Sequence, residues 1–387
     1  MVSRNTYVAL KTEVVKIADY YKQVWRTTKQ MDKTTVRILK AIQKLGPRNL
    51  LAVSRYTRIP FSSVYNRVGK MEALSGPIEY TLPNASKLGL ATMFALTSAK
   101  PGLEENVTQA LKVPGYWRMI VGCEGGSTHV SFHYVPFELV KAFQQYFKGM
   151  VTSGLALKNS VVMIGDYLPN DVNYDYYDPS RKLWKFCWDK WLNGLMKRKP
   201  TKTIEDPESY DVLVDRKDLV LIKELQIDAR KKFVDLAKPL GITLQAVKYR
   251  YDKKLVKHGI LGGSGLTIHP YPREIAAYYQ IFCEFASAPK MNRFYSYLNE
   301  LFFVVGRSKA LKRNALVLRV AILESQVSNL FRFLSELCRR NILTSYSGLR
   351  LRYDTRERQV IPIELFDDKT GWKFDYGRSM AALKKLA

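Results

Sequence analysis

The fold is decided by the stretch Asp215-Arg-Lys-Asp-Leu-Val-Leu-Ile-Lys-Glu-Leu-Gln-Ile-Asp-Ala-Arg230, continued by Leu236-Ala-Lys-Pro-Leu-Gly-Ile-Thr243 and Val247-Lys-Tyr-Arg250. Leu219, Ile222 and Leu225 recur at helical spacing, which predicts an amphipathic helix. Gly241 then supplies a turn, and Thr243 is a suitable cap for the helix that follows. The pattern therefore predicts a helix-turn-helix.

A second copy of this pattern lies nearer the N-terminus. An apolar-periodic helix is followed by a turn and by a helix that begins Phe61-Ser-Ser-Val-Tyr-Asn-Arg67. Val64 aligns with Val247 and Arg67 with Arg250, and both pairs are separated by 183 residues. A constant offset of this kind indicates an internal repeat, so the chain is predicted to be a tandem duplication.

Strand and helix signals alternate behind each helix-turn-helix in the order β-α-β-β-α-β. In the first copy the elements are expected at 88–98, 105–111, 116–122, 128–135, 137–147 and 161–167. In the second copy they are expected at 278–286, 292–301, 302–306, 315–323, 326–340 and 344–353. The order alone is common to many unrelated proteins, and it gains weight here because it occurs twice.

The predicted fold class is α+β, with two helix-turn-helix (winged-helix-like) modules and two βαββαβ ferredoxin-like domains arranged as a covalent pseudo-dimer. The expected segments are an N-terminal amphipathic helix (1–33), the first helix-turn-helix (34–82), the first βαββαβ domain (83–168), a linker with an aromatic and basic helix (169–210), the second helix-turn-helix (211–263), the second βαββαβ domain (264–366) and a C-terminal tail (367–387).

The second half resembles the Lrp/AsnC (leucine-responsive or feast-famine) transcription regulators, which join a helix-turn-helix to a βαββαβ domain of the RAM type. The resemblance rests on Asp215, Asp218, Ile222, Leu225, Gln226, Asp228, Ala229, Arg230, Leu236, Ala237, Leu240, Gly241, Val247, Arg250 and Gly259-Ile260. The first half matches through Ile38-Leu39, Leu51-Ala52, Val64, Arg67 and Lys87-Leu88-Gly89. Together the two copies cover most of residues 35 to 365.

This resemblance predicts a sequence-selective regulator that binds double-stranded DNA through two unlike recognition helices. The residues expected to contact DNA are Arg55, Arg58, Ser62, Ser63, Tyr65, Asn66, Arg67, Thr243, Gln245, Lys248, Tyr249, Arg250, Lys253 and Lys254. Ser62 and Thr243 are expected to cap their helices. Arg67 and Arg250 are expected to clamp phosphate or to hold the helix pair together.

Two alternatives remain open at the level of sequence. One is an architectural DNA-binding protein with little sequence preference, and the other is a ligand-sensing or catalytic member whose helix-turn-helix units are scaffolds. The chain has 62 Lys and Arg against 35 Asp and Glu, a formal net charge of +27 over 387 residues. A charge of this size favours a polyanionic partner, which is why DNA binding is the leading prediction.

In the Lrp/AsnC family, small effectors bind between subunits near the loop that joins the middle strands. The resemblance therefore implies a tentative effector site at Gly122, Glu124 and Gly125 in the first copy and at Gly306 and Arg307 in the second. The basic residues of the second loop do not match the family's usual acidic residue. A homo-oligomer formed through the βαββαβ domains is a further expectation.

The usual signatures of enzymes and metal sites are absent from the sequence. There is no phosphate-binding loop, nucleophile elbow or His-Glu-x-x-His helix, so we expect no enzymatic activity, no cofactor and no metal. His129 and His133 would share one face of a strand, without a carboxylate or thiol nearby. The four cysteines are widely spaced and no signal peptide or membrane-length apolar run is evident, so a cytoplasmic, membrane-free protein is expected.

Overall fold

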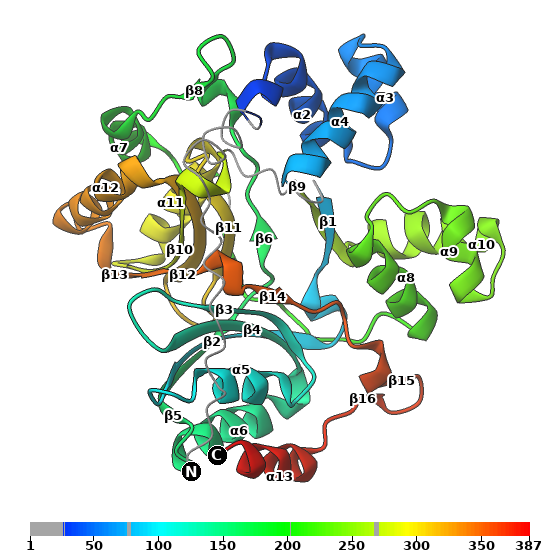
Figure 1. Cartoon of the computed structure of the whole chain (residues 1–387), viewed down its shortest axis with the longest axis vertical. Helices are drawn as coiled ribbons and strands as arrows, with labels where there is room; N and C mark the ends of the chain where they lie inside the picture. The colour runs from blue at the N-terminus through cyan, green and yellow to red at the C-terminus, as the bar shows by residue number, and fades with distance from the viewer. Residues whose placement is uncertain (1–25, 27, 76–78, 202, 267–270) are drawn as a thin grey trace, which may run out of the picture.

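A computed structural model of the chain describes residue 26 and residues 28–75, 79–201, 203–266 and 271–387. Two five-stranded antiparallel sheets pack against each other, and the helix-turn-helix modules lie beside them on one side (Figure 1). The predicted α+β class is confirmed. The expected amphipathic helix at 1–33 lies almost entirely outside the described residues.

The first helix-turn-helix consists of α2 (Lys33–Leu45), α3 (Leu50–Thr57) and α4 (Phe61–Ser75). The second consists of α8 (Arg216–Ile227), α9 (Phe233–Leu240) and α10 (Leu244–Tyr249), which continues as a π-helical turn, η4 (Arg250–Val256). In both modules an aspartate caps the first helix, Asp32 for α2 and Asp215 for α8. The carboxylate of each accepts an otherwise unpaired N–H of the first turn.

A two-stranded ribbon joins the modules. Strand β1 (Glu79–Pro83) leaves the first module and pairs antiparallel with β9 (Leu261–Leu266), which leaves the second. The Arg48 guanidinium ties them further, because it donates to the carbonyls of Ala229 and Lys231 at 2.6 and 2.8 Å. The modules are thus fixed to each other.

Each sheet domain follows the predicted order of elements. The first contains β2 (Leu90–Ala99), α5 (Glu104–Lys112), β3 (Trp117–Gly122), β4 (Thr128–Pro136), α6 (Val140–Thr152) and β5 (Ala156–Ile164). The second contains β10 (Ala276–Phe285), α11 (Ala288–Tyr297), β11 (Val304–Lys309), β12 (Ala315–Leu323), α12 (Val327–Arg339) and β13 (Leu343–Arg350). The last strand of the first copy begins five residues before the predicted 161, because this edge strand exposes polar side chains such as Lys158 and thus lacks an apolar signature.

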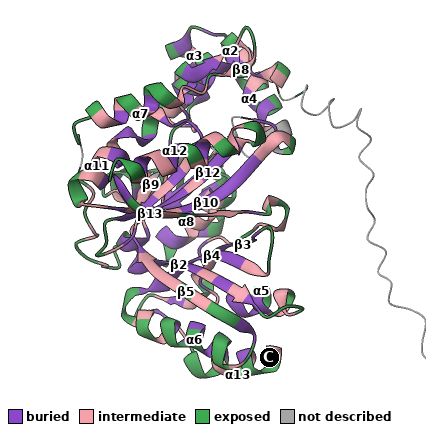
Figure 2. Ribbon diagram, turned by 90° about the vertical axis from the view of Figure 1, so that its left-hand side faces the viewer, coloured by how far each residue is buried: buried purple, intermediate pink, exposed green. Residues whose placement is uncertain are grey.

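The inner faces of the two sheets form one apolar layer. Phe94, Val130 and Phe132 from the first sheet meet Tyr278 and Val317 from the second. The outer faces are covered by helices, α5 and α6 on one side and α11 and α12 on the other (Figure 1). Figure 2 shows that burial concentrates in the strands, as expected for sheets covered on both faces.

An arm leaves each sheet domain and packs on the opposite one. The first arm contains β6 (Leu168–Pro169), the hairpin β7 (Tyr177–Asp178) and β8 (Leu183–Trp184), and helix α7 (Trp188–Lys197). The second contains β14 (Glu357–Arg358), the hairpin β15 (Phe366–Asp367) and β16 (Gly371–Trp372), and helix α13 (Tyr376–Leu386). Strand β6 pairs with β11 of the second sheet, and β14 pairs with β3 of the first. The two arms, 168–197 and 357–386, therefore have the same order of elements and are related by the same duplication.

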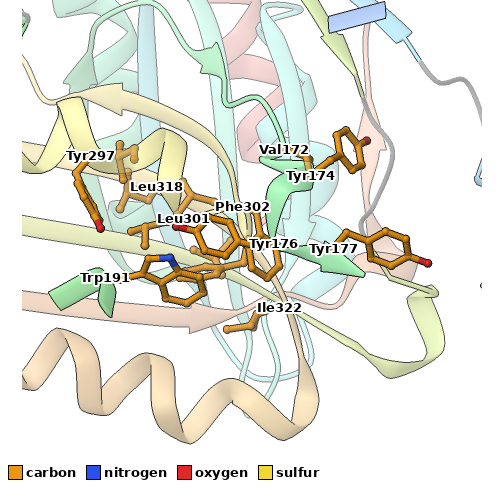
Figure 3. Packing of buried hydrophobic residues seen from close by; sticks show 14 of the residues in the cluster. Val172, Tyr174, Tyr176, Tyr177, Trp191, Tyr297, Leu301, Phe302, Leu318 and Ile322 are labelled. Atoms are coloured by element: carbon orange, nitrogen blue, oxygen red, sulfur yellow. The ribbon is translucent and has the colours of Figure 1, made fainter. Parts of the chain in front are cut away.

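The first arm makes an aromatic core against the second sheet domain. Trp191 is fully buried, and its ring lies 5.3 Å from that of Tyr176 and 5.8 Å from that of Phe302. Figure 3 shows these rings packed together beside Leu318 and Ile322. This core also contains Met31 and Ile38 of the first helix-turn-helix, so each module shares a core with the opposite sheet domain.

The second helix-turn-helix has the corresponding arrangement. Leu219, Leu236 and Val247 belong to the same apolar cluster as Phe143 and Tyr146 of the first sheet domain. A module held in this way cannot reorient without opening a domain core. Among the residues that the structure describes, none of the helices has the length and apolar character needed to cross a bilayer.

Candidate functional site

A partly open cavity of about 70 Å³ lies between the two sheets. Its lining consists of Leu82, Thr92, Arg118, Met119, Phe132, Tyr134, Tyr167, Arg319 and Arg358. These residues come from both copies and from the second arm. Three are arginines and none is acidic, so the cavity concentrates positive charge next to aromatic walls. We call it the arginine cavity.

Arg118 reaches the cavity because of a bulge in strand β3. The pairing of β3 with β4 shifts between Trp117 and Met119, so Arg118 is the extra residue. A bulge changes the direction of a side chain, and here successive residues, Arg118 and Met119, both line the cavity. The Arg118 guanidinium lies 5.0 Å from the centre of the Tyr134 ring.

The charge of Arg118 is poorly compensated. Its Nε and Nη1 atoms are buried without a hydrogen-bond partner. Burial lowers the pKa of the guanidinium and the charge of Arg358 lowers it further, whereas Tyr134 raises it. Buried donors without acceptors are costly, so this arrangement favours an anion that would occupy the cavity.

Arg319 is the second cation, and it stands on the apolar inner face of β12. Its Nη2 donates to the Gln280 side-chain oxygen at 3.1 Å, and its Nε has no partner. The guanidinium lies 5.4 Å from the ring of Phe132 and 5.8 Å from that of Tyr167. These cation–π contacts help to hold the guanidinium in place, and its Nη1 donates to the Met119 sulfur at 2.8 Å, so Nε is the atom left for a ligand.

The duplication predicts a twin of this cavity, and the structure shows that the twin is filled. The pairing of β11 with β12 has the same shift between Val304 and Gly306, which places Val305 where the first copy has Arg118. The ring of Tyr167 occupies the space above Gly306, since a Cβ built there would lie 1.5 Å from the Tyr167 hydroxyl. One copy is open and basic, and the other is apolar and closed.

The predicted clamps of DNA phosphate are engaged inside the protein. Arg67 donates to Asp32 at 2.7 Å, and Arg250 donates to Asp215 and Asp218 at 2.8 and 2.6 Å. These pairs join the last helix of each module to its first helix. Of the two roles considered for these arginines, holding the helix pair is the one that the geometry shows.

The other residues predicted to contact DNA lie on two separate helix faces. Those exposed are Arg55, Arg58, Ser62, Tyr65, Asn66, Thr243, Gln245, Lys248, Tyr249 and Lys253. Ser63 is half-buried. Lys254 pairs with Asp218 and Asp215, and so belongs to the internal network. Ser62 does not cap α4, because this helix begins at Phe61 directly after Pro60, whereas Thr243 accepts the N–H of Ala246 at 3.2 Å as predicted.

Most of the residues expected at an effector site contact other parts of the chain. The N–H of Gly122 donates to the Thr355 hydroxyl, and the N–H of Glu124 to the Arg350 carbonyl. Gly125 lies in the exposed turn between β3 and β4. Gly306 faces Tyr167, and the Arg307 guanidinium lies 4.4 Å over the Tyr295 ring. The structure does not bring these residues together in one site.

The histidines of β4 lie outside the arginine cavity. His133 is fully buried next to Ser131, and burial lowers its pKa to about 3, so it is neutral near pH 7. His129 lies 3.1 Å from the Thr108 hydroxyl. Within the described parts of the chain, no group of three or more His, Cys, Asp or Glu residues is arranged to hold a metal ion.

The arginine cavity was missed by the sequence analysis, although two of its residues carry a signal. Arg118 and Arg319 are lone cations in the apolar runs Tyr116–Gly122 and Ala315–Leu323. A charge within a strand buried on both faces indicates either a buried partner or a ligand. Arg358 has no such signal, because its position beside β3 depends on the exchange of arms.

Comparison with known proteins adds one family domain and a whole-chain likeness. Residues 214–253 match the AsnC-type helix-turn-helix domain. The crystal structure of the siroheme decarboxylase NirDL matches with a TM-score of 0.50 and 12% identity, over 92% of this chain and 98% of that one. The same enzyme in co-complex with an iron-uroporphyrin III analogue matches with a TM-score of 0.48 and 12% identity, over 83% and 91%. No curated protein sequence matches this chain.

The whole-chain likeness corrects two predictions. The tandem of helix-turn-helix and βαββαβ units suggested a DNA-binding transcription regulator without enzymatic activity, and the match over nearly the full length of both chains is to an enzyme. Both predictions are therefore wrong. The error has a physical reason: a helix-turn-helix pattern reports how three helices pack, and this packing serves equally well as a scaffold.

Proposed function

We propose that this protein binds a polycarboxylate tetrapyrrole at the arginine cavity, which receives a carboxylate side chain of the ligand, with its two helix-turn-helix modules acting as scaffolds. The observation that carries the proposal is the set of three arginines around a cavity without any acidic lining residue. Guanidinium groups bind carboxylates through charge-assisted and often bidentate hydrogen bonds. Phe132, Tyr134 and Tyr167 add aromatic surface suited to the edge of a flat ring.

The reaction class that accompanies this ligand is decarboxylation, which the name of the similar enzyme supplies. In such a reaction the bond from a side-chain carbon to its carboxylate breaks, carbon dioxide leaves, and the electron pair passes into the conjugated ring. The side-chain carbon then takes up a proton. The Tyr134 ring lies 5.0 Å from the Arg118 guanidinium in this cavity, and we assign its hydroxyl the role of proton donor.

Binding and catalysis are tested separately. Absorption titration with iron-uroporphyrin III should show saturable binding to the wild-type chain, and Arg319→Met should weaken it by at least about tenfold, the loss of one charge-assisted contact. Release of carbon dioxide from siroheme then tests the reaction. Binding without carbon dioxide release would leave a ligand-binding protein, and absence of saturable binding would refute the proposal as a whole.

A further inference from the structure

A second cavity lies next to the arginine cavity and has a separate lining. Tyr167 lines the arginine cavity, whereas its neighbours Asp166 and Leu168 line the second, which has a volume of about 360 Å³. The other lining residues are Ser86, Lys87, Gly165, Thr203 to Ser209, Tyr295 and Arg307 to Lys309. This cavity is formed by the end of strand β11, the start of the first sheet domain and the segment 203–209.

The part of the lining outside segment 203–209 is basic. It contains Lys87, Arg307 and Lys309 against one carboxylate, Asp166. Asp166 is already engaged, since it accepts hydrogen bonds from the Ser86 hydroxyl at 2.6 Å and from the Ser86 N–H at 3.2 Å. The Nε of Arg307 is buried without a partner. Without segment 203–209, three cations would face a cavity with no free acidic group in this part of its lining.

Segment 203–209 supplies the missing negative charge. It carries Glu205, Asp206 and Glu208, and we call it the acidic strap. One oxygen of the Asp206 carboxylate accepts a hydrogen bond from the Lys309 ammonium. The other accepts a hydrogen bond from the backbone N–H of Lys312 at 3.0 Å. The Lys309 side chain is only 12% exposed. Burial alone would raise the pKa of Asp206, yet these two hydrogen bonds hold it below its ordinary value.

The contacts of Asp206 are those that a free anion would make. An ammonium and a backbone N–H converge on its two oxygens, with a guanidinium in the same cavity. Few other hydrogen bonds hold the acidic strap. One of them runs from the backbone N–H of Ile204 to the side-chain oxygen of Asn292 at 3.2 Å. Ile204 is the one strap residue packed against the apolar core, and it is only partly buried, so the strap can leave at the cost of that single contact.

We propose that this second cavity is a site for a compact dianion, and that Asp206 is its built-in occupant. A phosphate or a small dicarboxylate would take the place of the Asp206 carboxylate on Lys309 and on the Lys312 N–H, and the acidic strap would be displaced. Binding of such an anion is therefore opposed by the strap in the wild-type chain. The proposal is independent of tetrapyrrole binding, because the two cavities share no lining residue.

The test is calorimetric titration of the full chain with inorganic phosphate. If Asp206 occupies the site at least nine-tenths of the time, Asp206→Asn should bind phosphate about tenfold tighter than wild type or more. Adding Lys309→Met to Asp206→Asn should abolish this binding. Glu205→Gln removes a charge from the same strap without touching Lys309, and should leave the wild-type affinity within about twofold.

A second readout follows the strap itself. Phosphate should speed cleavage of the wild-type chain by a glutamate-specific protease at Glu205 and Glu208, because these side chains are already exposed and displacement frees the strap backbone to enter the protease active site. Titration with malonate in parallel distinguishes a dicarboxylate from phosphate as the preferred dianion. Equal phosphate affinity of wild type and Asp206→Asn, or insensitivity of Asp206→Asn to the loss of Lys309, would overturn the proposal.

Discussion

The two sheet domains have the same fold and differ where they face each other. At the bulge of the first domain stands Arg118, and at the bulge of the second stands Val305. The first opens into the arginine cavity, whereas Tyr167 fills the space above Gly306 in the second. Covalent duplication allows this divergence, because a homodimer must present two identical sites and a fused pair need not.

The two arms should be equivalent in stability even though the cavities are not. Trp184 stacks 4.5 Å from Phe302, and Trp372 donates its indole N–H to the Leu88 carbonyl at 2.7 Å. Trp184→Ala and Trp372→Ala should each lower the free energy of unfolding by about 3–5 kcal/mol. Urea unfolding followed by circular dichroism measures both. An effect below about 1 kcal/mol for either variant would show that its arm is only loosely attached.

Arg118→Val gives the first copy the residue type of its twin, so it should separate binding from stability. Affinity for iron-uroporphyrin III should fall by about thirtyfold or more, the loss of a charge-assisted hydrogen bond of about 2–3 kcal/mol. The melting temperature should stay constant or rise, because an unpaired buried charge is replaced by an apolar side chain. Loss of both binding and stability would instead show that Arg118 is structural.

Gly306→Ala tests whether the twin cavity is closed by Tyr167. The new Cβ would overlap the tyrosine ring, which must then shift, and the overpacking should cost about 1–3 kcal/mol of unfolding free energy. Gly126→Ala is the matched control, since a Cβ there would meet no atom within 4 Å. Equal melting temperatures of the two variants would contradict the assigned position of Tyr167.

The smallest expected effect is on the pH dependence of stability, which should differ slightly between the two helix-turn-helix modules. The ion pairs with Arg250 and Lys254 hold the pKa of Asp215 at about 2, although burial by itself would raise it. A carboxyl whose pKa is depressed on folding contributes stability above its unfolded pKa, and this stability is lost as the pH falls through the folded pKa. The loss should therefore occur between about pH 4 and pH 2.

Arg250→Met should reduce this acid dependence by about 1 kcal/mol, a modest value because Asp215 is 42% exposed and water screens the pair. Arg67→Met is the control in the first module. Its ion pair, Arg67 with Asp32, is more exposed than the pair of Arg250 with the buried Asp218, so its loss should have a smaller effect. Unfolding free energies measured at pH 2, 4 and 7 compare the variants. A larger effect from Arg67→Met would reverse the expected order.

The fold could be predicted because its signals are local. The spacing of Leu219, Ile222 and Leu225 is enough to predict a helix. The offset of 183 residues that Val64 and Val247 share with Arg67 and Arg250 indicates the duplication. An aromatic helix was predicted within 169–210, but the exchange of the two arms between the sheet domains was not, although a signal for their equivalence existed. Trp184-Lys-Phe186 recurs as Trp372-Lys-Phe374, yet without apolar periodicity these residues resemble a linker and a tail.

The site could not be predicted in the same way because it depends on the pairing of the two copies. Arg118 and Arg319 are 201 residues apart and share a cavity only because the sheets pack face to face. The sequence did show each arginine within an apolar strand, but which side it faces depends on a bulge for Arg118. The predicted function failed for another reason, because a helix-turn-helix pattern reports how three helices pack and not what they bind.

The most direct test of this account is the number of tetrapyrroles bound per chain. Calorimetric titration of the wild-type protein with iron-uroporphyrin III should give one site per chain, since the twin cavity is filled, and Arg118→Val should remove it. Two equivalent sites, or one site of unchanged affinity in Arg118→Val, would contradict the claim that the arginine cavity is the single binding site.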